Sequence, residues 1–157
     1  MTKKIIILDT DGVTSLGLIR SFAGPEFNVY AISTRSRKGL GYFSKYIYKK
    51  FYKKGGYSDQ SLLKLLIETP ELNGAHVFPT SDDMVVFLLR YRQELSGNGL
   101  LLPSAKVNYQ QLHDKDFIKD VASDSGFLVP KTYSFDRLDE ISFPVIIKPK
   151  NSLKFGK

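Results

Sequence analysis

Two short apolar segments with an amphipathic segment between them constrain the fold most strongly. Residues 3–8 read KKIIIL and residues 28–32 read NVYAI, and turn formers follow the first run directly. Continuous apolar runs of this length are typical of strands buried on both faces. Residues 14–25 place apolar side chains at helical spacing, with Thr14 or Ser15 as a suitable N-cap. The order predicts a βαβ unit with parallel strands and a right-handed crossover.

The same rhythm continues along the chain. It predicts a helix over residues 58–67 capped by Ser58 or Asp59, a strand over 75–78, a helix over 81–91 capped by Ser81, and a short strand over 100–102. We therefore predict an α/β fold with a Rossmann-like parallel sheet over residues 1–108.

The rhythm changes in residues 109–157. A helix is expected to begin at Asp114 and to end at Gly126, a residue suited to the position after a helix. Two strands are expected to follow, over residues 131–134 and 144–148. This segment is predicted to be a second, smaller folding unit.

Composition excludes several classes of protein. The chain has 157 residues, of which 42% are hydrophobic and 25% charged, enough to bury one core. It has no cysteine, which excludes disulfides and a thiolate nucleophile. No apolar run approaches the roughly 20 residues that span a bilayer, so we expect no membrane partner and a cytoplasmic location. His76 and His113 have no third ligand at metal spacing, and we predict no metal site within the chain.

Positive charge is concentrated in one segment. Lys and Arg outnumber Asp and Glu by 23 to 16, and residues 35–54 contain basic and aromatic residues but no acid. Such a stretch could bind single-stranded nucleic acid through phosphate contacts and base stacking. It could also be an edge strand whose aromatic rings pack and whose lysines prevent edge pairing. We favour the edge strand, so nucleic acid is not the expected partner.

The most conspicuous catalytic motif follows the first predicted strand. Asp9, Thr10, Asp11 and Gly12 resemble the Asp-x-Asp-Gly motif of haloacid dehalogenase-type phosphatases, in which Asp9 would be the nucleophile and Asp11 the general acid beside Mg²⁺. The other parts of that active site do not follow in the required order. We therefore expect these residues to form a solvated turn, with the phosphatase as an alternative function. The glycine patterns of dinucleotide sites and P-loops are not met either.

A longer pattern lies further along the chain. Asp114 and Lys115 open a helix, Gly126 and Pro130 follow at a regular spacing, and residues 143–149 read FPVIIKP. This order resembles the start of the ATP-grasp fold. Residues 15–22, 44–46 and 78–83 are similar to segments of the domain that precedes that fold in the carbamoyl-phosphate-synthase-like and D-aspartate-ligase-like branch. The resemblance implies a pre-ATP-grasp domain over 1–108 and the beginning of the ATP-grasp subdomain over 109–157.

The resemblance also implies a function, that of an ATP-dependent carboxylate ligase working through an acyl phosphate. Lys115 and Lys148 correspond to the lysines that contact the ATP phosphates in that family. The small carboxylate substrate is assigned by position to Arg20, Thr80, Ser81 and Asp82. ATP and Mg²⁺ are the expected cofactors of the complete enzyme, with the metal ligands outside this chain.

The resemblance covers only the N-terminal part of the family's fold. We therefore expect this chain to be a truncated ligase without activity alone. Self-association through the incomplete C-terminal sheet is a further expectation.

Overall fold

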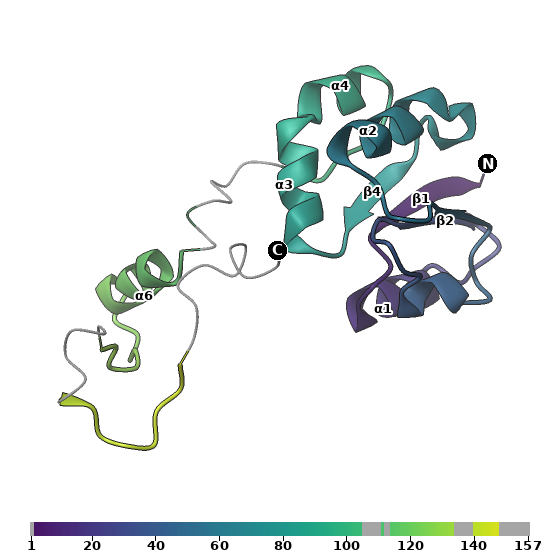
Figure 1. The fold of residues 1–157 in the computed structure, drawn as a ribbon. Helices are drawn as coiled ribbons and strands as arrows, with labels where there is room; N and C mark the ends of the chain where they lie inside the picture. Colours follow the sequence, from purple (N-terminus) through teal and green to yellow (C-terminus); the bar gives the residue numbers. More distant parts are fainter. Residues whose placement is uncertain (1, 105–110, 112–113, 134–139, 148–157) are drawn as a thin grey trace. The chain divides into compact units, whose positions relative to one another are not determined.

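The structure is a computed structural model and describes residues 2–104, 111, 114–133 and 140–147. The chain divides into two compact units, Met1–Ser104 and Ala105–Lys157. The first contains the sheet, and the second contains a ten-residue helix, Lys115–Asp124 (Figure 1).

The first unit is built on a four-stranded parallel sheet. Its strands are β1 (Lys3–Leu8), β2 (Phe27–Ser33), β3 (Lys49–Tyr52) and β4 (His76–Pro79), in the spatial order β3-β2-β1-β4. β1 pairs with β2 and β4, and β2 pairs with β3, all in parallel. The predicted α/β fold with a parallel sheet is confirmed. The basic stretch over residues 35–54 forms an edge strand only at Lys49–Tyr52, because β3 lies at one end of the sheet while Leu40–Phe43 form a 3-10 helix.

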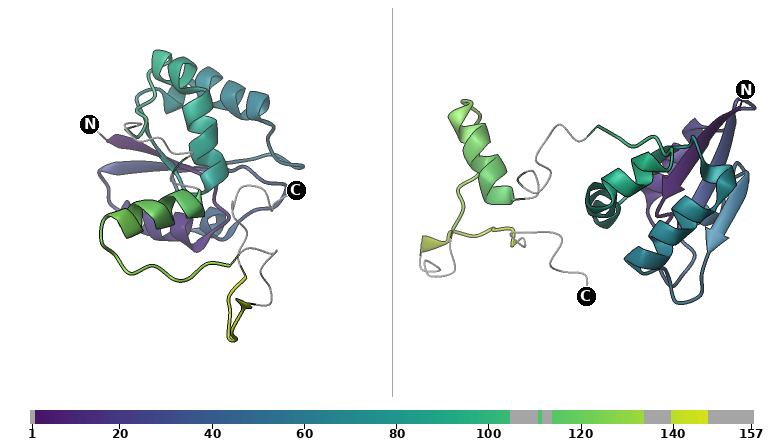
Figure 2. Two further views of the ribbon diagram at one scale, coloured as in Figure 1. Left: turned by 90° about the vertical axis from the view of Figure 1, so that its left-hand side faces the viewer. Right: turned by 90° about the horizontal axis from the view of Figure 1, so that it is seen from above.

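Helices cover both faces of this sheet (Figures 1 and 2). The helical elements of the unit are α1 (Val13–Ser21), η1 (Leu40–Phe43), α2 (Asp59–Glu68), η2 (Pro70–Leu72), α3 (Asp82–Arg90) and α4 (Arg92–Gly97). Alternate residues of β1 point to opposite faces. Ile5 and Ile7 pack with Ile19 of α1. On the other face, Ile6 and Leu8 lie in the larger core with residues of α2, α3 and α4. The central strand is therefore buried on both faces, as its apolar run predicts.

The order of connections reverses beside β1. The chain moves from β1 to β2 and β3 on one side, and then crosses back to place β4 on the other side of β1. Right-handed crossovers put the helices of the two directions on opposite faces, as observed for α1 and α2. The expected strand over 100–102 is only a single parallel bridge between His76 and Leu101.

The second unit contains α6 (Lys115–Asp124). The Asp114 side chain caps it by accepting hydrogen bonds from the backbone N–H of Asp116 and Phe117. Gly126 has a φ of 82°, and the N–H groups of Gly126 and Phe127 bond back to the last turn. Both predicted helix ends are confirmed.

The two strands predicted after α6 do not form in the described residues, 131–133 and 144–147. Ile146 and Ile147 are more than 80% exposed. A strand needs a neighbour for its backbone hydrogen bonds, and the described part of this unit supplies none. Residues 134 and 148 lie outside the described residues.

Candidate functional site

The candidate site lies at the carboxyl ends of β1 and β4. These strands are neighbours, yet the chain leaves them in opposite directions, which makes the space beyond their ends a topological switch point. Open parallel sheets bind ligands in the crevice at such a point. The segments that build it are residues 9–12, which lead into α1, and residues 80–81, which lead into α3.

The turn after β1, expected to be solvated, is buried at its first two residues, whereas Asp11 is half-buried and Gly12 is exposed. Asp9 is 3% exposed and Thr10 is fully buried. Asp9 has a φ of 73°, in the left-handed region that short polar residues tolerate best. Its Oδ1 atom accepts a hydrogen bond of 3.2 Å from the backbone N–H of Asp11. The carboxylate therefore holds the turn, and burial ties its position to the core.

Two arginines neutralise the acids of this turn. Arg35 Nε lies 3.6 Å from Asp9 Oδ2, and Arg35 Nη1 lies 3.2 Å from Asp11 Oδ2. Arg37 Nη2 lies 3.6 Å from the same oxygen of Asp11. A phosphatase of the alternative kind would need these carboxylates for Mg²⁺ and for attack on phosphorus. Their ion pairs with Arg35 and Arg37 disfavour that role.

The loop that carries these arginines covers the β2 side of the turn. Gly41 N–H donates a 3.0 Å hydrogen bond to the Thr10 carbonyl oxygen. A Cβ atom on Gly39 would lie 2.3 Å from that same oxygen, so only glycine fits there. The loop thus closes the β1–β2 side.

Thr80 fastens the end of β4 to the end of β1. Its backbone N–H donates to the Leu8 carbonyl oxygen at 3.1 Å, and its hydroxyl donates to the carbonyl oxygens of Leu8 and Asp9. Its hydrogen bonds therefore give Thr80, a predicted substrate residue, a structural role in aligning the two strand ends.

Two hydroxyl groups at the switch point have no hydrogen-bond partner among the described residues. Thr10 Oγ1 and Ser81 Oγ are buried and form no hydrogen bond within the described structure. A buried hydroxyl without a partner costs about 1–3 kcal/mol. A water or an ion bound at the strand ends is one explanation for such unpartnered groups.

The helices that begin at this site have no side-chain cap, and neither does α4. The N-terminal positions of α1 and α3 are Gly12 and Ser81, and neither provides a side-chain cap. In contrast, Ser58 caps α2 and Asp114 caps α6 with side-chain oxygens. Helix starts carry partial positive charge and N–H groups that can bind an anion. The first turn of α1 contains no acid, whereas that of α3 contains Asp82 and Asp83, so α1 is the more favourable of the two for an anion.

The predicted site residues are only partly brought together. Thr80, Ser81 and Asp82 follow β4 directly at the switch point. Arg20 lies in the last turn of α1, about 10 Å further along the helix axis from its start, and lines a groove with Lys45 and Tyr46 instead. Lys115 is the first residue of α6 in the second unit. Lys148 lies outside the described residues, so its pairing with Lys115 around ATP stays a prediction.

The described part of the chain contains no group of three or more His, Asp or Glu side chains placed to hold a metal ion. We assign no Mg²⁺ ligand to it. None of its helices has the length and apolar character required to cross a bilayer.

Comparison with protein-family models finds no matching family, and neither the curated proteins nor the solved structures give a significant match to this chain.

Proposed function

We propose that residues 1–104 bind a small carboxylate, and that the chain contributes this unit to an ATP-dependent carboxylate ligase. The observation that carries the proposal is the pair of uncapped helix starts at the switch point, together with the unpartnered hydroxyls of Thr10 and Ser81. The ligase chemistry rests on the sequence resemblance, in which Lys115 and Lys148 would contact the ATP phosphates.

The site suits a carboxylate for electrostatic and geometric reasons. The first turn of α1 contains no acid, and the carboxylates of Asp9 and Asp11 just before it are paired with arginines, so a carboxylate placed there would be stabilised by the helix dipole. Thr10 is fully buried, so its hydroxyl would reach the carboxylate only if the Gly39 loop shifts on binding, and it would then gain a hydrogen bond without giving up an existing one. Asp82 and Asp83, in the first turn of α3, favour a ligand whose far end is neutral or positively charged.

Chemical-shift titration of the full chain tests the proposal. Acetate, succinate, D-aspartate and L-glutamate would be added in turn, with inorganic phosphate in parallel. We expect one carboxylate to shift the amide signals of residues 10–14 and 81. Thr10→Val, which removes only the hydroxyl, should weaken that binding about tenfold. Ser21→Ala removes a hydroxyl at the other end of α1 and serves as the matched control.

Two results would contradict the proposal. One is the absence of shifts at residues 10–14 with every carboxylate. The other is a response to phosphate alone, which would indicate a phosphate-binding unit.

A further inference from the structure

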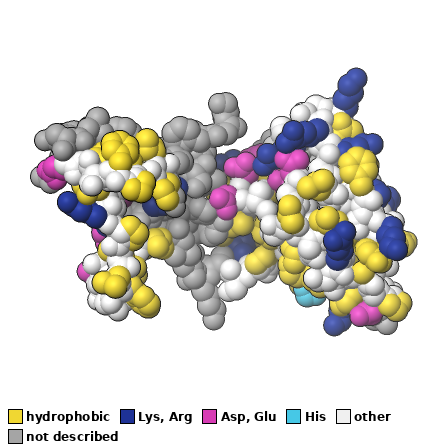
Figure 3. Space-filling model, turned by 90° about the horizontal axis from the view of Figure 1, so that it is seen from below, with side chains coloured by type: hydrophobic (Ala, Val, Ile, Leu, Met, Phe, Trp, Pro, Cys, Tyr) yellow, Lys and Arg dark blue, Asp and Glu magenta, His cyan; other side chains and the backbone are white. Residues whose placement is uncertain are grey.

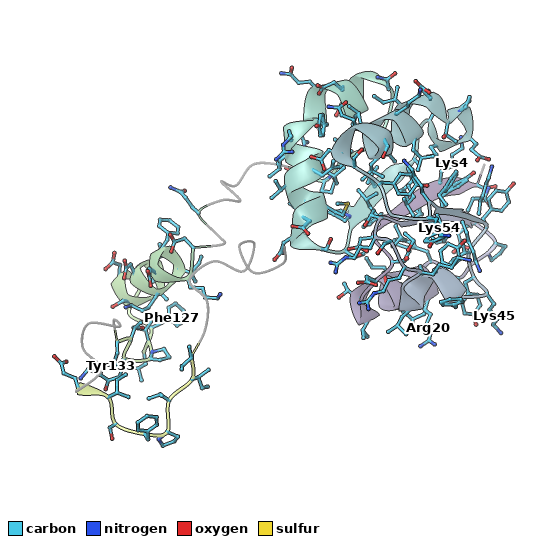
Figure 4. The ribbon with its side chains drawn as sticks, in the orientation of Figure 1. Lys4, Arg20, Lys45, Lys54, Phe127 and Tyr133 are labelled. Carbon is cyan, nitrogen blue, oxygen red and sulfur yellow. The ribbon has the colours of Figure 1, made fainter. Side chains whose placement is uncertain are left out.

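A groove lies between α1 on one side and η1 with the segment after it on the other. Its lining includes Leu16 and Arg20 of α1, Phe43 of η1, and Lys45 and Tyr46 of the following segment, and its volume is about 650 Å³. Arg20 and Lys45 are the charged residues of the lining, and both are basic. Figure 4 shows both side chains on the same side of the unit.

The aromatic rings of this groove are exposed. Phe43 is 69% exposed and Tyr46 is 43% exposed. The sequence favoured packed rings in this segment, and for these two residues that interpretation is wrong. The physical reason is that η1 and the turn after it lie against α1, outside the sheet, where no further layer covers them in the described structure. Exposed rings of this size commonly mark binding surfaces.

A second basic and aromatic cluster adjoins the groove. The Nζ atoms of Lys38 and Lys50 lie 5.1 and 5.4 Å from the ring centre of Tyr42. The Tyr42 ring meets the Phe43 ring edge-on at 5.8 Å, which joins this cluster to the groove. The continuous surface, here named the basic-aromatic surface, consists of Arg20, Lys38, Tyr42, Phe43, Lys45, Tyr46 and Lys50. Basic and hydrophobic side chains are interleaved on the face of the unit seen in Figure 3.

The cations of this surface have no acidic partner in the part of the chain that the structure describes. Acidic residues pair with three neighbouring basic side chains, namely Arg35, Arg37 and Lys49. In contrast, Arg20, Lys38, Lys45 and Lys50 form no ion pair within the described residues. Four cations around exposed rings therefore present a charge that an anionic partner would complement.

We propose that the basic-aromatic surface binds single-stranded nucleic acid. Successive bases would stack on the Phe43 and Tyr46 rings, while the four cations contact phosphates along the strand. The exposed rings favour a single strand over duplex DNA, because the bases of a duplex are already stacked on one another and are not free to stack on the protein. Their alternation with cations also fits a polymer of alternating bases and phosphates better than an acidic protein. This inference is independent of the carboxylate site.

Fluorescence anisotropy with labelled single strands of about 12 nucleotides, oligo-dT and oligo-U, tests the proposal on the full chain. Binding should weaken with salt, and the slope of log K against log salt should be about −3, because each neutralised phosphate contributes about 0.7 for a single strand. A duplex of the same length should bind more weakly than either single strand.

Four variants separate stacking from general charge attraction. Tyr46→Leu removes the ring and keeps an apolar side chain, and should weaken binding about tenfold. Lys45→Gln should lower affinity and reduce the salt slope by about 0.7. Tyr133→Leu and Lys64→Gln are the matched controls, because Tyr133 belongs to the second unit and Lys64 lies in α2. Both should bind like the original chain.

Three outcomes would overturn the proposal. The first is no binding of either strand at about 50 mM salt. The second is an equal loss in Tyr46→Leu and Tyr133→Leu. The third is equal binding of the duplex, or equal competition by polyglutamate, either of which would reveal a general polyanion or acidic-protein surface.

Discussion

A Cβ atom on Gly39 would lie 2.3 Å from the carbonyl oxygen of Thr10. Gly39 has a φ of −81°, a value open to any residue, so space and not backbone conformation requires glycine here. This close approach lets the loop after β2 lie directly on the turn after β1, and it fixes one side of the candidate site.

Gly39→Ala should therefore destabilise the first unit. The new methyl group would meet backbone atoms of Thr10 and Asp11, which cannot move without disturbing the strand end, and we expect a loss of about 1–3 kcal/mol in the free energy of unfolding. Urea denaturation followed by circular dichroism measures it. Gly17→Ala is the control, because a Cβ there meets nothing within 4 Å. In the middle of α1 it should instead raise stability by about 1 kcal/mol. Equal effects of the two changes would contradict this account.

Thr10→Val should stabilise the ligand-free protein by about 1 kcal/mol, because it removes a buried hydroxyl that has no partner and keeps the shape of the side chain. Thr80→Val is the matched change at a hydroxyl that does bond to carbonyl oxygens, and it should cost about 1–2 kcal/mol. The same denaturation measurement compares them. A loss of stability in Thr10→Val would mean that its hydroxyl is satisfied.

The effect of replacing Asp9 depends on what replaces it. Asp9→Asn retains an oxygen for the Asp11 N–H and tolerates the positive φ, so it should cost less than about 1 kcal/mol. Asp9→Ala loses the hydrogen bond and adds backbone strain, and should cost about 2 kcal/mol. The unfolding midpoints of the two variants measure both losses. Equal losses would show that the ion pair between Asp9 and Arg35 contributes more than the hydrogen bond within the turn.

Stability should fall in strong base, and Tyr57 should contribute to this. Burial, and after it the charge of the nearby Tyr42, raises the pKa of Tyr57 above its ordinary value of 10.0. The unfolded chain then releases this proton at a lower pH than the native chain does. The stabilisation is complete below pH 10 and is lost as pH rises through the native pKa. Tyr57→Phe should flatten the decline in unfolding free energy above pH 10, and an unchanged slope would contradict this prediction.

Asp114→Ala should loosen α6. The carboxylate accepts two backbone hydrogen bonds at the start of the helix, and its loss should cost about 1 kcal/mol. Hydrogen exchange of the Ile118 and Val121 amides in the full chain would accelerate about fivefold. Asp120→Ala removes a carboxylate within the same helix and should leave these rates nearly unchanged. Comparable acceleration in both variants would assign the effect to charge instead of capping.

Local sequence patterns predict the fold of the first unit well because they report local physics. The apolar run of β1 and the capping residues Ser58 and Asp114 act within a few positions, and each is confirmed. The predicted strands after α6 fail for the complementary reason. Ile146 and Ile147 have strand-like side chains, but a strand also requires a partner, which a local pattern cannot supply.

The candidate site is less predictable from the sequence. Its position at the end of β4 follows from the strand order, and Ser81 and Asp82 lie there as expected. Arg20 does not, because a helix of nine residues carries its last turn away from the strand ends. The hydroxyl of Thr10 and the pairing of Arg35 with Asp9 depend on a contact between distant loops. The one local signal for the buried Thr10 hydroxyl is the sequence itself, in which a threonine stands between two aspartates at the end of a strand.

The loop that carries Gly39 packs on the turn after β1 from the β2 side, whereas Ser81 and Asp82 follow β4 on the other side. The two sides of the site can therefore change in sequence separately. Changes at Ser81 or Asp82 would alter the chemistry offered to a ligand without replacing any side chain of the two cores. Related chains could thus acquire different ligand preferences through one short segment while inheriting the same scaffold.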